Sequence, residues 1–91
     1  MFFRNFIELY FNFFNELCLD LGQITSCFER KELAHARTMY DKAMARIELF
    51  LALGFINKDI FDLLTSELDN YYNDKFLKFL IGEFDNGKEE N

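Results

Sequence analysis

The segment from Ala45 to Leu68 (ARIELFLALGFINKDIFDLLTSEL) constrains the fold most, because one helix ends and the next begins within it. Gly54 follows an apolar run and can adopt the left-handed backbone conformation that closes a helix, with Phe55 packing back on Leu51. Asn57 is a favourable N-cap, because its side-chain oxygen can accept a hydrogen bond from a free backbone amide of the next helix. A linker this short makes the two helices antiparallel neighbours. The segment therefore predicts a helical hairpin.

The composition agrees with a chain made of helices. The 91 residues contain no proline and only four glycines, so few positions interrupt a helix. Apolar residues make up 51% of the chain and 13 of them are phenylalanine, which supplies a core for one small domain. We therefore expect an all-α fold: a small three-helix bundle, or a four-helix bundle, with a central antiparallel helical hairpin.

Local signals set the expected helix boundaries within a single helical domain over residues 1–82. Gly22 is expected to end the first helix, and Ser26 with Glu29 has the spacing of a capping box that would begin the second. In the third helix, lysines fall where apolar residues are due, which suggests a break near Asn73 and Asp74. The alternative is one straight helix with an apolar patch exposed near its end. The expected helices cover residues 3–21, 27–53, 58–73 and 74–81, and residues 83–91 are expected to form a flexible acidic tail.

The first helix is apolar over a wide arc, roughly 200° of the helical wheel. Its expected inner side includes Ile7, Phe14 and Cys18. Further large apolar side chains exceed what one small core needs, so they either are buried or form an oligomer or partner interface. These residues are Phe2, Phe3, Leu9, Phe11 and Leu19 in the first helix, with Leu49 and Leu53 beside the hinge.

Acidic side chains recur along the third helix. The chain has a formal net charge of −6, and residues 57–91 contain nine acidic and four basic residues. This charge favours a basic protein partner, such as a nucleic-acid-binding protein or a nuclease complex. The competing interpretation is a solvated helix face. The candidate partner-binding residues are Asp59, Asp62, Glu67, Asp69 and Asp74.

No arrangement of residues indicates catalysis, a metal site or a cofactor. Cys18 and Cys27 lack the spacing of a zinc, haem or redox motif. Two buried free thiols in a reducing cytoplasm are the expectation, with a disulfide as the alternative. His35 is the only histidine and is expected on a solvated stripe, with Glu32 one turn before it. We therefore expect a protein that is not an enzyme and binds no metal.

The sequence disfavours direct binding to nucleic acid or to a membrane. An acidic chain is repelled by phosphates and by anionic lipids. Lys31, Lys42 and Arg46 lie on one stripe of the second helix and could contact nucleic acid, but nearby acidic residues favour a solvated face with ion pairs. The apolar N-terminal stretch is interrupted by polar residues, so neither a spanning helix nor a signal peptide is expected, and we expect a cytoplasmic location.

Parts of the chain resemble small helical-hairpin proteins of phages and mobile elements. The resemblance rests on the segments MYD (39–41) with Ala43, ALGFIN (52–57) and FDLL (61–64). Small acidic single-domain proteins of this kind include anti-defence inhibitors such as anti-CRISPR proteins. The resemblance implies stoichiometric binding to a host nuclease or its guide complex, without catalysis, and it assigns no functional residue.

Three functions remain open from the sequence. The first is a non-enzymatic inhibitor or adaptor that acts through protein contacts. These contacts would be made by the acidic candidates of the third helix, by the apolar candidates of the first helix and the hinge, or by both. The second is a structural homo-oligomer, with a homodimer through the first helix as its simplest form. The third is a small nucleic-acid-binding regulator that would use the basic stripe.

Overall fold

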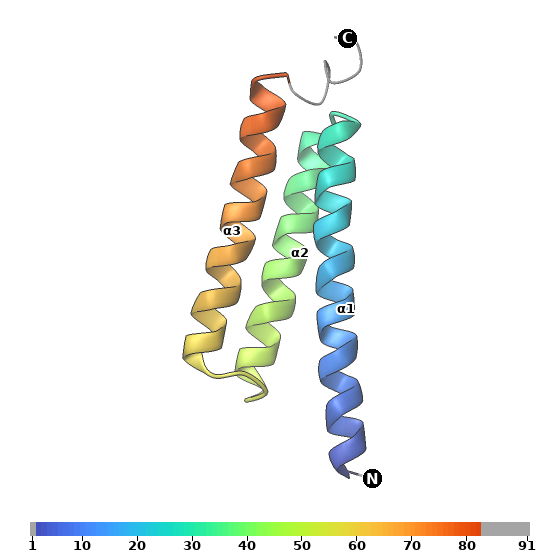
Figure 1. Cartoon of the computed structure of the whole chain (residues 1–91), viewed down its shortest axis with the longest axis vertical. Helices are drawn as coiled ribbons and strands as arrows, with labels where there is room; N and C mark the ends of the chain where they lie inside the picture. Colours follow the sequence, from blue (N-terminus) through green and yellow to red (C-terminus); the bar gives the residue numbers. More distant parts are fainter. Residues whose placement is uncertain (1, 83–91) are drawn as a thin grey trace.

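A computed structural model describes residues 2–82, with side chains from residue 7 onward. It contains three helices, α1 (Phe2–Glu29), α2 (Leu33–Ala52) and α3 (Lys58–Leu80), and no strand in the described residues. Figure 1 shows the helices side by side, with successive helices running in opposite directions. Each helix packs on the other two. The predicted all-α three-helix bundle is confirmed, whereas the predicted acidic tail (83–91) lies outside the described residues.

Helix α1 is longer than predicted, because Gly22 does not end it. The helix continues for seven residues past Gly22, through Ser26, so the predicted capping box is wrong. Gly22 is exposed, and a Cβ built there meets nothing within 4 Å, so the position imposes no close approach. Beyond it, Ile24, Cys27 and Phe28 are completely buried. Burying these three side chains outweighs the roughly 1 kcal/mol by which glycine disfavours a helix interior.

Both turns of the bundle use the same helix-closing hydrogen bonds. At the α2–α3 turn, Gly54 has φ of 81°, its amide donates to the Leu51 carbonyl, and the Phe55 amide donates to the Phe50 carbonyl. This is a Schellman motif, as predicted for Gly54, and the Phe55 ring lies 5.2 Å from the Phe50 ring between centroids. Asn57 caps α3 as predicted, because its side chain accepts from the Ile60 amide.

The α1–α2 turn builds this motif without glycine. The Lys31 amide donates to the Phe28 carbonyl, and the Glu32 amide donates to the Cys27 carbonyl over 2.8 Å. Lys31 occupies the position of Gly54 with φ of 62°, the only non-glycine residue at positive φ in the described chain. Helix α2 therefore begins at Leu33 and ends at Ala52, not at residues 27 and 53 as predicted.

Helix α3 is continuous, so the predicted break near Asn73 and Asp74 is wrong and the straight-helix alternative is confirmed. Asp74 does not cap a new helix; it pairs with Lys78 at 3.6 Å within α3.

The second half of α3 packs against the Phe28 ring of α1. The rings around Phe28 are those of Tyr72, Phe76 and Phe79, at 5.5, 6.0 and 6.0 Å between centroids. The expected exposed patch near the end of α3 consists of Leu77, Leu80 and Ile81.

At the opposite end of the bundle, α1 packs on the hinge. Phe13 stacks on Phe50 with ring centroids 3.9 Å apart, and the edge of Tyr10 contacts Phe50 and Phe55. Figure 1 shows that the N-terminal turns of α1 extend beyond the α2–α3 turn. The first turns of α1 therefore have no helix of the described chain beside them.

Candidate functional site

One row of side chains along α1 is covered by α3 at one end and open at the other. Successive members are four and three residues apart, the spacing of a heptad seam. The row, called the α1 row below, consists of Ile7, Phe11, Phe14, Cys18, Leu21 and Thr25. At its covered end, the hydroxyl groups of Thr25 and Tyr71 of α3 form a hydrogen bond, and Leu21 packs on the core.

The open half of the α1 row consists of its first four members. Ile7, Phe11 and Phe14 are 53%, 67% and 43% exposed, and Cys18 is also exposed. This corrects the sequence analysis, which placed Ile7, Phe14 and Cys18 on the buried side and both cysteines in the core. The periodicity of a helix that is apolar over a wide arc shows which residues share a face, but it does not show how far a neighbouring helix covers that face.

A pocket lies beside the middle of the α1 row, between α1 and α3. It has a volume of about 360 Å³. Leu17 and Leu21 line it from α1, Ile47 from α2, and Leu64, Glu67, Leu68, Asn70 and Tyr71 from α3. Ile60 and Leu63 are exposed one turn before Leu64 and Glu67 on the same side of α3. The open half of the α1 row and this edge of α3 thus flank an apolar depression with a carboxylate at its wall.

The five acidic candidates do not all lie on one side of α3. Glu67 faces α1 at the pocket, whereas Asp69 faces α2 and accepts a hydrogen bond from the Tyr40 hydroxyl. Asp62 pairs with Lys58 at 2.6 Å, and Asp74 pairs with Lys78. Asp59 is exposed in the first turn of α3. Several of these carboxylates therefore already have partners within the chain.

The Tyr40–Asp69 contact joins α2 to α3. The hydrogen bond to the Asp69 carboxylate, together with partial burial, raises the pKa of Tyr40 to about 12. Arg37 lies over the Tyr40 ring, 4.6 Å from its centroid, and the Tyr72 ring lies 4.9 Å away. Asp69 therefore holds a position within the fold in addition to carrying surface charge.

The remaining predicted interface residues are scattered. Leu9 and Leu19 are exposed on α1, and Leu49 with Leu53 is exposed at the hinge end of α2, one turn apart. The side chains of Phe2 and Phe3 lie outside the described residues. Of the predicted set, only Phe11 belongs to the α1 row.

The basic stripe of α2 is incomplete as a nucleic-acid surface. Arg46 points into the bundle, where its Nε donates to Asp20 of α1 over 3.0 Å and its Nη2 lies 3.8 Å from Glu16. Asp20 is only 4% exposed, so this ion pair is largely removed from solvent. Lys31 and Lys42 remain on the surface.

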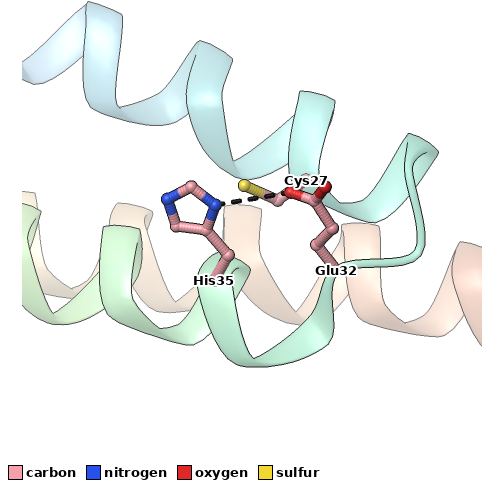
Figure 2. A group of neighbouring side chains, drawn as sticks. All are labelled: Cys27, Glu32 and His35. Carbon is pink, nitrogen blue, oxygen red and sulfur yellow. Dashed lines mark hydrogen bonds and ion pairs between the residues drawn. The ribbon is translucent and has the colours of Figure 1, made fainter.

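A second cluster of polar side chains lies at the α1–α2 turn. Cys27 of α1 approaches Glu32, the residue before α2, and His35 of α2, and their potential ligand atoms all lie within 4.8 Å of one another (Figure 2). The Arg30 guanidinium donates to Glu32 over 3.1 Å and to the Cys27 sulfur over 3.7 Å. The hydrogen bond from Arg30 is the largest cause that lowers the pKa of Glu32, and the hydrogen bond from His35 is the second. Both cysteines are free thiols.

Comparison of the chain with protein-family models, with curated proteins and with solved structures finds no match. None of the described helices combines the length and the apolar character needed to cross a membrane.

Proposed function

We propose that this protein is a non-enzymatic binding module, an inhibitor or adaptor, that binds one amphipathic helix of a basic protein partner along the open half of the α1 row. The exposure of Ile7, Phe11 and Phe14 at heptad spacing is the observation that carries the proposal. Large apolar side chains that are aligned and exposed on one helix are characteristic of helix-binding surfaces.

Charge supports a basic partner. The chain has a net charge of −6, and Glu67 stands at the wall of the pocket beside the α1 row. A helix with an apolar stripe and flanking lysines or arginines would fill the depression and approach Glu67. Stoichiometric inhibition of a nuclease complex, as the resemblance to anti-CRISPR-type proteins implies, is one specific form of this function.

The test uses a synthetic amphipathic peptide with leucine at the heptad a and d positions and lysine on the flanks, followed by fluorescence anisotropy. We expect saturable one-to-one binding that weakens as salt concentration rises. Phe11→Asp should weaken binding at least about tenfold, since it places a charge in the apolar contact. Leu77→Asp is the matched control, because Leu77 is 57% exposed on α3 and outside the α1 row.

Two results would count against the proposal. Equal affinity of the wild type and Phe11→Asp for the peptide would show that the α1 row does not form the binding surface. Equal affinity of the wild type for the designed peptide and for a peptide with scrambled leucine positions would indicate non-specific charge attraction.

A homodimer through the same row is the second candidate, because heptad spacing also suits a second copy of α1. The net charge of −6 opposes bringing two copies together. Light scattering after size-exclusion chromatography, over a concentration series, separates the two functions. A monomer at high micromolar concentration supports the binding module, whereas a dimer that Phe11→Asp dissociates would assign the row to self-association.

A further inference from the structure

We propose that Cys27, Glu32 and His35 form a binding site for a zinc ion at the α1–α2 turn. This inference is independent of the proposed helix-binding function and departs from the expectation that the chain binds no metal. It rests on the donor atoms, on their spacing and on the backbone that holds them.

The three donors match the preferences of zinc. A thiolate sulfur, an imidazole nitrogen and a carboxylate oxygen are the three ligand types that zinc binds in proteins. Hard cations such as magnesium and calcium prefer oxygen donors alone, so the sulfur argues against them. Three protein ligands leave the fourth tetrahedral position to water.

The spacing of the donors is close to that of a tetrahedral site. Bonds of about 2.1 Å to nitrogen and oxygen place two such ligands about 3.4 Å apart around zinc. His35 Nδ1 and Glu32 Oε1 are already 3.4 Å apart. The Cys27 sulfur, bonded at about 2.3 Å, belongs about 3.6 Å from each of them. Since all three atoms lie within 4.8 Å of one another, a shift of about 1 Å completes the geometry.

The fold itself brings the ligands together. The Glu32 amide donates to the Cys27 carbonyl, so the hydrogen bond that closes α1 also joins the backbones of two ligands. Glu32 is the residue before α2 and His35 lies in the first turn of α2. Figure 2 shows the Cys27 sulfur of α1 directed toward the His35 imidazole of α2, with the Glu32 carboxylate beside the cysteine. In the single helix predicted over residues 27–53, Cys27 and His35 would be about 12 Å apart along the axis, which is why the sequence did not reveal the site.

A cation already lies at this cluster. The Arg30 guanidinium contacts Glu32 at 3.1 Å and the Cys27 sulfur at 3.7 Å, and its side chain is 49% exposed. Zinc would displace it into solvent and bond the same two groups. On binding, the Cys27 thiol loses its proton to the buffer, a zinc–sulfur bond forms, and zinc releases bound water.

The test is isothermal titration of chelator-treated, reduced protein with zinc, in buffers of different ionisation enthalpy. We expect one-to-one binding with release of about one proton at pH 7.5. His35→Asn should weaken binding at least about tenfold, whereas Cys18→Ser should leave it unchanged. Arg30→Ala should tighten binding, because a competing cation is removed. Cobalt substitution should give a thiolate-to-cobalt charge-transfer band that Cys27→Ser abolishes and Cys18→Ser retains.

Absence of one-to-one binding, or equal affinity of the wild type and His35→Asn, would overturn the assignment. So would a charge-transfer band that disappears with Cys18→Ser, or loss of binding in Arg30→Ala. Since Cys27 is buried, the result for Cys27→Ser counts only if the circular dichroism spectrum of this variant matches that of the wild type. Proton release and the exposed His35→Asn variant test the site without that substitution.

Discussion

At the scale of single residues, Lys31 holds a backbone conformation that glycine adopts without strain. Its φ of 62° closes α1 in the way that Gly54 closes α2. A side chain in the left-handed region costs about 1–2 kcal/mol, partly offset by the greater backbone entropy that glycine loses on folding. We expect Lys31→Gly to raise the free energy of unfolding by about 0.5–1 kcal/mol, measured by urea denaturation with a chelator present. Lys42→Gly, in the interior of α2, should lower it by about 1 kcal/mol. A loss of stability in Lys31→Gly would contradict the interpretation of the turn.

Tyr40 provides a prediction about alkaline pH. Its pKa rises to about 12 in the folded protein, against an ordinary value near 10, chiefly because its hydroxyl donates to Asp69. The folded state therefore keeps this proton when the unfolded state has lost it. The stabilisation is fully present below pH 10 and disappears as pH rises from 10 to 12.

The measurement compares wild-type protein with Tyr40→Phe by urea denaturation between pH 9 and 12. Tyr40→Phe should be the less stable protein at pH 9, and the difference should close toward pH 12. A difference that stays constant over this range would show that the hydroxyl proton does not contribute to stability.

At the scale of elements, the ion pair between Asp20 and Arg46 fixes α1 against α2. Removing one member leaves the other charge largely buried, which costs more than the loss of an exposed pair. Since the Arg46 side chain is 23% exposed, we expect Arg46→Ala to lower the free energy of unfolding by about 2–3 kcal/mol. The exposed Lys58–Asp62 pair is the control, and Lys58→Ala should cost less than about 1 kcal/mol despite the 2.6 Å contact.

Arg46→Ala could lower stability because it leaves the Asp20 charge buried without a partner, or because it removes an ion pair that is itself stabilising. The double variant Asp20→Leu with Arg46→Leu distinguishes these two explanations. Replacing both charges by apolar side chains should recover most of the stability, because no charge remains unpaired. If the double variant is less stable than Arg46→Ala alone, the ion pair contributes net stability and the burial argument is wrong.

The element boundaries show what the sequence could predict. The α2–α3 turn was predictable because its signals, Gly54 and Asn57, act within a few residues. The α1–α2 turn was not, because local signals at Gly22 and Ser26 compete with contacts made by Phe28 to residues more than 40 positions away. The turn that formed instead closes through Lys31, a residue that carries no turn signal.

At the scale of the whole molecule, the candidate sites depend on how far each helix covers the next. The sequence predicted an excess of apolar side chains on α1, and Phe11, one of those it named, is exposed. It could not separate the open half of the α1 row from the covered half, because that depends on where α3 meets α1. The cluster of Cys27, Glu32 and His35 depends in the same way on the position of the α1–α2 turn.

The two cysteines can be used to measure how often the bundle opens, because one is exposed and the other is buried. Cys18 is exposed on α1, whereas Cys27 is completely buried. A maleimide reagent should therefore modify Cys18 rapidly and Cys27 only in molecules that have opened, so the ratio of the two rates reports the opening equilibrium. For a domain with about 5 kcal/mol of stability, we expect Cys27 to react about 10³-fold or more slowly in chelator, measured by mass spectrometry of peptides over time. Urea should bring the two rates together, which controls for intrinsic reactivity.

Rates within tenfold of each other in water would mean that the α1–α2 end opens without the rest of the bundle, and that the ligands of the proposed zinc site are not held in place by the fold.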